Sequence, residues 1–98
     1  MFDKVKKIFE LQSKINQIKQ ELGKLTTEAS SPDGKIKIVI NGEQKVQDIQ
    51  IDSALLNNSD CTKLQKELTD CINQAILKSQ KMAAEKAKEI TGLDLPGL

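Results

Sequence analysis

The chain has 98 residues, a net charge of +1 and 38% hydrophobic residues, which allows one domain with a small core. All fifteen basic residues are lysines and there is no histidine, so a histidine base and the usual zinc ligand sets are both missing. We therefore expect no catalytic residue, no metal and no cofactor, and the near-zero net charge does not by itself indicate a nucleic-acid partner.

A long first helix is predicted over residues 3–25. Its apolar residues recur at alternating spacings of three and four, an unbroken heptad repeat formed by Ile8, Leu11, Ile15, Ile18, Leu22 and Leu25. Such a stripe fits a helix packed on its own domain, and it equally fits a coiled-coil-like contact with a second copy of the chain. The sequence leaves both possibilities open.

The first turns of this helix contain Lys4, Lys6 and Lys7. Positive charge is unfavourable at this end, because the helix dipole and the free N–H groups already make it positive. The lysines are either a solvated helix end or an anion-binding tip, since the N–H groups and the lysine charges would attract the same anion.

A small sheet is predicted in the region 26–52. Its clearest strand has Ile36, Ile38 and Ile40 alternating with other residues, which is typical of a strand with one apolar face. It is followed by Asn41-Gly42, a dipeptide that tolerates positive φ and is typical of tight hairpin turns.

The second strand of this hairpin is predicted at about residues 45–51, with Ile49 and Ile51 on one face. Val46 is out of phase with these two residues, so it either faces the other side or lies beside a β-bulge. Residues 25–30 are a candidate for a third, shorter strand.

A second long helix is predicted over residues 60–91, followed by a short mobile tail at 92–98. Alanines replace larger apolar residues in its late part, between 78 and 88, so we expect this part to project from the core. Cys61 and Cys71 lie about 15 Å apart along such a helix, too far for a disulfide. They are therefore interpreted as small buried residues.

The central motif resembles that of a known family. It comprises an alternating apolar strand, an Asn-Gly turn and a second strand ending in I-x-I-D-x-x-L-L, formed by Gly34, Ile36, Ile38, Ile40, Asn41, Gly42, Val46, Ile49, Ile51, Asp52, Leu55 and Leu56. Together with the flanking helices and the Leu-Pro-Gly tail at 95–97, it makes the whole chain resemble the YbaB/EbfC family of small bacterial nucleoid-associated proteins.

The resemblance implies an α+β fold in a single domain over residues 1–98: a long helix, a small antiparallel three-stranded sheet and a long helix, assembled as a tweezer-like dimer. It also implies a cytoplasmic, nucleoid-associated protein that binds double-stranded DNA with little sequence preference and affects DNA organisation and gene expression. The expected partners are DNA and a second copy of the chain. No membrane or small-molecule partner is expected, since no stretch approaches the roughly 20 apolar residues that span a bilayer.

The candidate DNA-binding residues are lysines near the start of the first helix and late in the second: Lys4, Lys6, Lys7, Lys14, Lys81, Lys86 and Lys88. The hairpin reverses the chain, so we expect the two groups to meet in space. Without arginine, phosphate contacts are favoured over base reading. The candidate dimer-interface residues are the isoleucines of the hairpin: Ile36, Ile38, Ile40, Ile49 and Ile51.

Two alternative functions remain. One is a coiled-coil scaffold or a prefoldin-like chaperone, which also places β-hairpins between two helices, although such proteins have longer helices with apolar tips. The other is binding to a membrane surface through Phe2, Val5, Ile8 and Phe9 beneath the nearby lysines.

Overall fold

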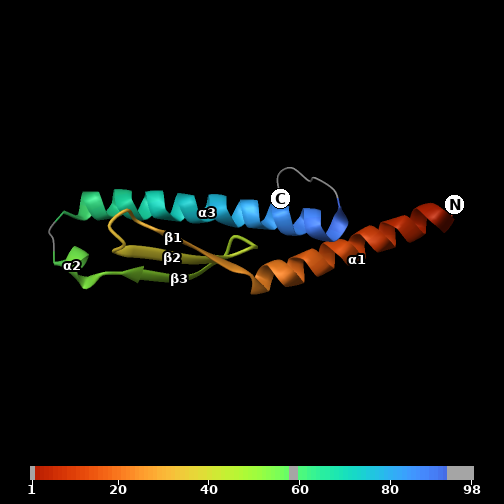
Figure 1. Cartoon of the computed structure of the whole chain (residues 1–98), viewed down its shortest axis with the longest axis horizontal. Coiled ribbons are helices and arrows are strands. Elements are labelled where there is room, and N and C mark those ends of the chain that lie inside the picture. Colours follow the sequence, from red (N-terminus) through yellow and green to blue (C-terminus); the bar gives the residue numbers. More distant parts are fainter. Residues whose placement is uncertain (1, 58–59, 93–98) are drawn as a thin grey trace.

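Residues 2–57 and 60–92 are described by the computed structural model of the chain (Figure 1). The elements follow in the order α1 (Phe2–Lys24), β1 (Thr26–Ser30), β2 (Ile36–Asn41), β3 (Val46–Ile51), α2 (Ser53–Leu56) and α3 (Cys61–Thr91). This order confirms the predicted fold of a long helix, a three-stranded antiparallel sheet and a long helix. The candidate third strand is present as β1, whereas the four-residue α2 was not predicted. Beyond Gly92, the predicted tail lies outside the described residues.

Local signals explain where the last two helices begin and end. The Asp52 side chain accepts a hydrogen bond from the Ala54 N–H at 2.9 Å and so begins α2, and Asp60 accepts one from Lys63 at 3.1 Å at the start of α3. These are N-cap interactions, which satisfy N–H groups that a helix start leaves free. The helix α3 ends at Gly92, whose φ of 72° is the left-handed conformation that glycine adopts readily.

The core is formed where α3 covers one face of the sheet. The strand order is β1-β2-β3, and both pairs are antiparallel. Ile36, Ile38 and Ile40 of the central strand are fully buried, as the alternation predicted, and they pack with Cys71 and Ala75 of α3. The burial of these side chains fixes which face of the sheet α3 occupies.

A β-bulge sets the register of the third strand. Val39 pairs with Asp48, but Ile40 pairs with Val46, so Gln47 is an extra residue between the two pairs. The bulge shifts the alternation by one and places Val46 on the same face as Ile49. Of the two interpretations of Val46, the bulge is therefore the correct one.

The apolar face of β3 is left largely uncovered. Ile49 is directly opposite Ile38 on the neighbouring strand, yet it is 45% exposed, and Val46 is 44% exposed. The reason is position: α3 packs on β1 and β2, and β3 lies beyond it at the edge of the sheet.

The β2–β3 turn holds the end of α1, and this is the role of the glycine in Asn41-Gly42. The Gly42 N–H donates to the carbonyl oxygens of Leu22, at 2.9 Å, and Leu25, at 3.1 Å. A Cβ on Gly42 would lie 2.7 Å from Leu22 Cδ2 and 3.0 Å from the Leu22 carbonyl oxygen. The dipeptide tolerates positive φ, but the residue of this turn that adopts it is Gln44, at 64°. Glycine is needed here for close approach and not for its φ.

The two long helices are antiparallel, but the part that projects is not the predicted one. Late in α3, Ala83 and Ala87 are buried against Ile18 and Leu22 of α1, so this section is packed and does not project. The first part of α1, residues 2–15, extends beyond the end of α3 instead (Figure 1). We call this part the α1 arm. It makes the molecule 66 Å long and only 20 × 18 Å across.

Replacing core and edge isoleucines tests this arrangement. Ile38→Ala should lower the free energy of unfolding by about 2–5 kcal/mol, because the side chain is fully buried. Ile49→Ala removes the same atoms from a half-exposed position, so its cost in a dilute, monomeric sample should be clearly smaller. Lys37→Ala on the other face is the control, with a change within about 0.5 kcal/mol. Urea titration measures all three, and equal costs at both isoleucines would contradict the uncovered β3.

A second pair of variants tests the turn. Gly42→Ala should destabilise the protein by about 1–3 kcal/mol, because the new methyl group overlaps Leu22. Gln44→Gly is the matched control in the same turn and should stabilise it by up to about 1 kcal/mol, because glycine adopts positive φ without the steric cost. Thermal unfolding compares the two. A harmless Gly42→Ala with a destabilising Gln44→Gly would contradict this turn conformation.

Candidate nucleic-acid interface

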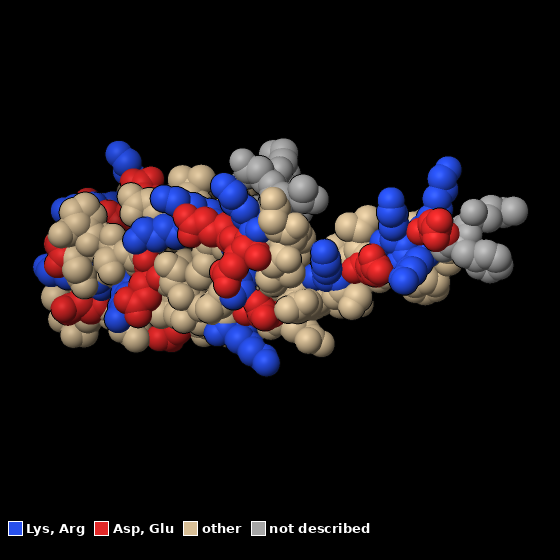
Figure 2. All heavy atoms as spheres, turned by 45° about the vertical axis from the view of Figure 1, so that its right-hand side comes forward, with Lys and Arg blue, Asp and Glu red and all other residues tan. Residues whose placement is uncertain are grey.

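The α1 arm carries a cluster of exposed lysines on a helix that projects from the body. Lys4, Lys6, Lys7 and Lys14 are all exposed, against Asp3 and Glu10 as the acidic residues of the arm. Figure 2 shows these basic side chains gathered along the arm, with acidic ones among them. At 100° per residue, Lys7 and Lys14 lie on one side of the helix, two turns apart. The arm therefore presents a short positive stripe that a row of phosphates could follow.

The lysines late in α3 are of two kinds. Lys81 and Lys88 are exposed and lie seven residues apart, so they share one face of the helix. Lys86 is half-buried and points toward α1, where its Nζ lies 3.1 Å from Glu21 Oε2 and 3.5 Å from Glu89 Oε1. Its charge is thus engaged within the protein.

The pairing of Lys86 with Glu21 has an electrostatic consequence. The Glu21 carboxylate raises the pKa of the Lys86 ammonium group above its ordinary value of 10.5, and Glu89 adds to this effect. The ion pair joins α1 to α3 next to the apolar contact of Ile18 and Leu22 with α3. Sequence reasoning missed Glu21, although its place beside Leu22 in the heptad repeat is a typical position for such pairs.

The two lysine groups do not meet within one chain. The end of α3 packs on the last turns of α1 and not on its start. From Lys7 to Ile18 the distance along the helix axis is about 17 Å. Lys4, Lys6 and Lys7 therefore form one surface at the arm, and Lys81 with Lys88 forms another on the body.

The isoleucines expected at a dimer interface are divided in the same way. Ile36, Ile38 and Ile40 are fully buried inside the protomer, so they have no surface to offer a second copy. Ile49 is exposed and Ile51 is half-buried. Of these five isoleucines, Ile49 and Ile51 of β3 thus keep surface for a partner.

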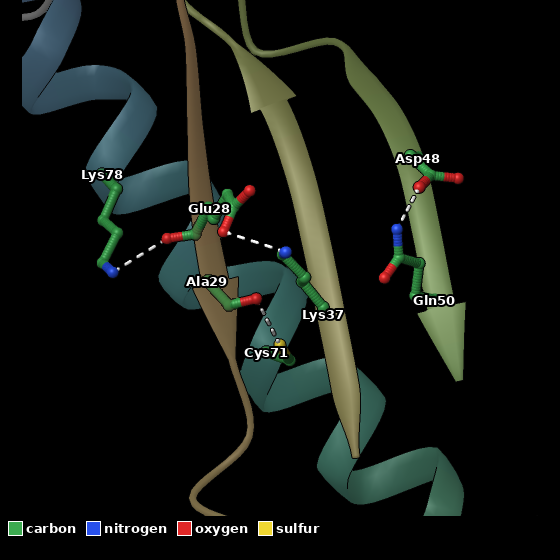
Figure 3. A network of polar contacts seen from close by, with 7 residues as sticks. All are labelled: Glu28, Ala29, Lys37, Asp48, Gln50, Cys71 and Lys78. Atoms are coloured by element: carbon green, nitrogen blue, oxygen red, sulfur yellow. Dashed lines mark hydrogen bonds and ion pairs between the residues drawn. The ribbon is translucent and has the colours of Figure 1, made fainter. Parts of the chain in front are cut away.

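The opposite edge of the sheet is covered by α3 (Figure 3). Lys78 Nζ donates to the Glu28 carbonyl oxygen at 2.9 Å, and Cys71 Sγ donates to the Ala29 carbonyl oxygen at 3.4 Å. On the face of the sheet away from α3, Lys37 forms an ion pair with Glu28 at 3.3 Å. Occupied carbonyl groups and charged side chains protect an edge strand from pairing with another chain.

The cysteines and acidic residues do not form a further site in the described part of the chain. Cys71 is buried, as predicted, and burial raises the pKa of its thiol. Cys61 is exposed, which corrects the prediction for that residue, because it is the first residue of α3, where residues 60–63 are all exposed. Within residues 2–57 and 60–92, no group of three or more metal-ligating side chains is found. No helix in these ranges is long and apolar enough to span a bilayer.

Comparison with known proteins relates this geometry to a family. The model of the YbaB/EbfC DNA-binding family matches residues 1–94. A nucleoid-associated protein of Syntrophobacter fumaroxidans is 34% identical over 98 residues, covering 99% of this chain and 89% of the relative. One from Moorella thermoacetica is 35% identical over 86 residues, covering 87% and 83%. The crystal structure of the uncharacterized protein HP0035 from Helicobacter pylori has a TM-score of 0.70 at 20% identity, covers 88% of this chain and 98% of that one, and shares the fold.

The role of Glu21 can be tested by titration. Because the pKa of Lys86 is raised in the folded state, its contribution to stability is complete below pH 10.5 and is lost as the pH rises through the raised pKa. Glu21→Gln should lower the pKa of Lys86 and flatten this part of the pH dependence. Glu28→Gln removes an ion pair elsewhere and should leave the pKa of Lys86 unchanged. NMR titration of the Lys86 Nζ resonance reports both, and equal pKa values in the three proteins would contradict the contact.

Proposed function

Since the chain belongs to the YbaB/EbfC DNA-binding family of nucleoid-associated proteins, we propose that it binds double-stranded DNA at the nucleoid through lysine–phosphate contacts, as a dimer. The observation that supports this most directly is the projecting α1 arm with four exposed lysines. Among the described residues, Lys4, Lys6, Lys7 and Lys14 have no ion pair within the protein. Their charges remain available to an external anion.

The proposed mode of binding is electrostatic. Lysine is a flexible point charge without the planar fork by which arginine recognises guanine, and the chain has no arginine. Contacts of this kind position a protein on the duplex without reading its sequence. We therefore propose little sequence preference, with effects on DNA organisation and gene expression that follow from coverage of the duplex.

The two lysine surfaces have different proposed roles. The arm lysines make the principal phosphate contacts, and Lys81 and Lys88 extend the basic surface along α3. Lys86 mainly links α3 to α1, because its charge is already neutralised by Glu21 and Glu89. A phosphate at Lys86 would have to compete with two carboxylates, so we expect this residue to contribute least among the seven.

Fluorescence anisotropy with two unrelated duplexes of equal length tests this function. If a dimer neutralises about six phosphates, its affinity should fall roughly 10³-fold between 50 and 200 mM salt, equally for both duplexes. Replacing Lys4, Lys6 and Lys7 with glutamine should weaken binding to both duplexes alike and reduce the salt slope by about one for each phosphate that is no longer neutralised.

The matched control replaces Lys35, Lys63 and Lys66, which are three exposed lysines at the opposite end of the molecule. This triple variant makes the same change in net charge, so it should retain most of the affinity if the arm is the site. Equal losses of affinity in both triple variants would indicate a diffuse charge effect. Absence of salt-dependent binding in the unmodified protein would refute DNA binding and favour the scaffold function.

A further inference from the structure

The α1 arm holds an aromatic side chain in water. Phe9 is 69% exposed, more than any other large apolar residue in the described part of the chain. The chain has only two aromatic residues, and both lie in the arm, at positions 2 and 9. The ring of Phe9 is therefore a large apolar surface that the core of the protomer does not use.

Phe9 does not belong to the apolar stripe of the arm, which is the part of the heptad repeat formed by Ile8, Leu11 and Ile15. At 100° per residue, Phe9 lies about 100–160° around the helix from these three residues. A chain that covers the stripe would therefore leave the ring in solvent, and α3 packs only on the later part of α1.

The lysines of the arm follow Phe9 in a definite order around the helix. Lys6 is about 60° from Phe9, and in the same direction Lys14 and Lys7 follow at about 140° and 160°. All four residues are exposed. One face of the arm thus has the aromatic ring at one border, Lys6 inside it and two lysines at the other border.

This face has the size of a DNA groove. A helix with its side chains is about 10–12 Å across, and the major groove is about 12 Å wide. The arm extends beyond the end of α3, so a duplex can approach it (Figure 1). A helix in the groove has base edges beneath it and phosphates on both sides. With Lys7 and Lys14 toward one row of phosphates, Phe9 faces base edges near the other row.

We propose that the α1 arm lies in the major groove with Phe9 in contact with the C5-methyl groups of thymine. The thymine methyl is the apolar group that base edges present in this groove, and G·C pairs have none there. The inference rests on the DNA binding of the proposed function and names the base that the arm contacts. Because every thymine carries the methyl group, the contact favours A·T-rich DNA without defining one sequence.

The acidic residues of the arm fit this orientation. Asp3 and Glu10 lie between Lys6 and Lys14 around the helix. They therefore face the base edges, which include amino-group donors, and not the rows of phosphates.

The residues around Phe9 favour a groove over a lipid surface. Its neighbours three and four residues away are Val5, Lys6, Gln12 and Ser13. On a membrane, Gln12 and Ser13 would enter hydrocarbon together with the ring and lose their hydrogen bonds to water. In a groove, the same side chains can form hydrogen bonds with base edges or phosphates.

Removing only the thymine methyl groups tests the contact. Fluorescence anisotropy at one salt concentration compares an A·T-rich duplex with the same duplex in which deoxyuridine replaces every thymine. The unmodified protein should bind the deoxyuridine duplex about 4- to 15-fold more weakly, for a methyl contact by one arm or by both arms of a dimer. Phe9→Ala should weaken binding to the thymine duplex by the same factor and change binding to the deoxyuridine duplex by less than about twofold.

Two further variants serve as controls. Leu77→Ala removes a side chain that is 65% exposed on α3, outside the arm, so it should keep the full difference between the duplexes. Phe9→Leu keeps an apolar side chain and should retain part of the difference. Circular dichroism verifies that the helices remain in each variant. A difference that persists in Phe9→Ala would mean that the methyl groups act through DNA shape, and it would overturn the proposal. Equal weakening of both duplexes by Phe9→Ala would overturn it as well.

The two proposals can fail separately. Equal, salt-dependent affinity of the unmodified protein for both duplexes would refute the thymine contact and leave DNA binding intact. If Phe9→Ala then abolished binding to phosphatidylglycerol vesicles, Phe9 would belong to a lipid-binding surface instead. No binding to either duplex would refute DNA binding, and the thymine contact with it.

Discussion

One helix has to cover three strands in this fold, and its width is sufficient for two. A helix with its side chains is about 10–12 Å across, whereas neighbouring strands lie nearly 5 Å apart. With α3 over β1 and β2, Ile36, Ile38 and Ile40 are fully buried, and the side chains of α3 reach the carbonyl groups along β1. The same placement leaves β3 with an apolar face and an open edge. The covered β1 and the uncovered β3 are thus two consequences of a single geometric limit.

Small residues on α3 allow the other helix to join this body. Ser79, Ala83 and Ala87 are buried along one face, and Ser79 Oγ donates to the Asn41 carbonyl oxygen at 2.7 Å, next to the turn that holds the end of α1. Short side chains let two backbones approach closely, so α1 packs there through Ile18 and Leu22. Past this contact α3 ends at Thr91, and the first part of α1 extends beyond it (Figure 1). The arm projects because α3 contacts only part of the heptad stripe of α1. Ile18 and Leu22 pack on α3, and the earlier residues of the stripe lie beyond its end.

Features with a local period could be predicted from the sequence, and those that depend on distant contacts could not. The alternation of Ile36, Ile38 and Ile40 and the heptad repeat of α1 each record which face of one element is apolar. The alanines of α3 do not indicate which face is buried, because a small residue fits a solvent-exposed face and a tight helix contact equally well. For this reason the late part of α3 was expected to project, whereas the start of α1 does. Gly42 was noticed for its turn, but its actual requirement is set by Leu22, twenty residues earlier.

The candidate site shows the same division between local and distant information. Lys4, Lys6 and Lys7 of the arm could be selected from their place at a helix start, where a positive charge is unfavourable for the helix itself. That Lys86 is already engaged by Glu21 depends on the crossing of two helices, which spacing along one helix cannot reveal. The binding function of all seven lysines stays a prediction. The structure adds that they differ in availability, with the arm lysines open to solvent and Lys86 held between two carboxylates.

The apolar stripe of the arm and three of its four lysines lie on different parts of the helix surface, and Lys4 continues the stripe because it precedes Ile8 by four residues. The apolar stripe of the arm is centred near Leu11 and Ile15, whereas Lys6 lies on the far side and Lys7 and Lys14 lie at one border of the stripe. A partner that covers the stripe therefore leaves lysines in water and gives the arm a rigid support. A phosphate contact by a single exposed lysine is weak, and charges held on a fixed support lose less entropy on binding than charges on a free helix. Two supported arms in one assembly would act together on a single duplex, with the second contact favoured by the effective concentration that the first creates. In this arrangement the exposed apolar surface of the protomer holds two chains together, and the dimer then presents the lysines of both arms to one DNA duplex.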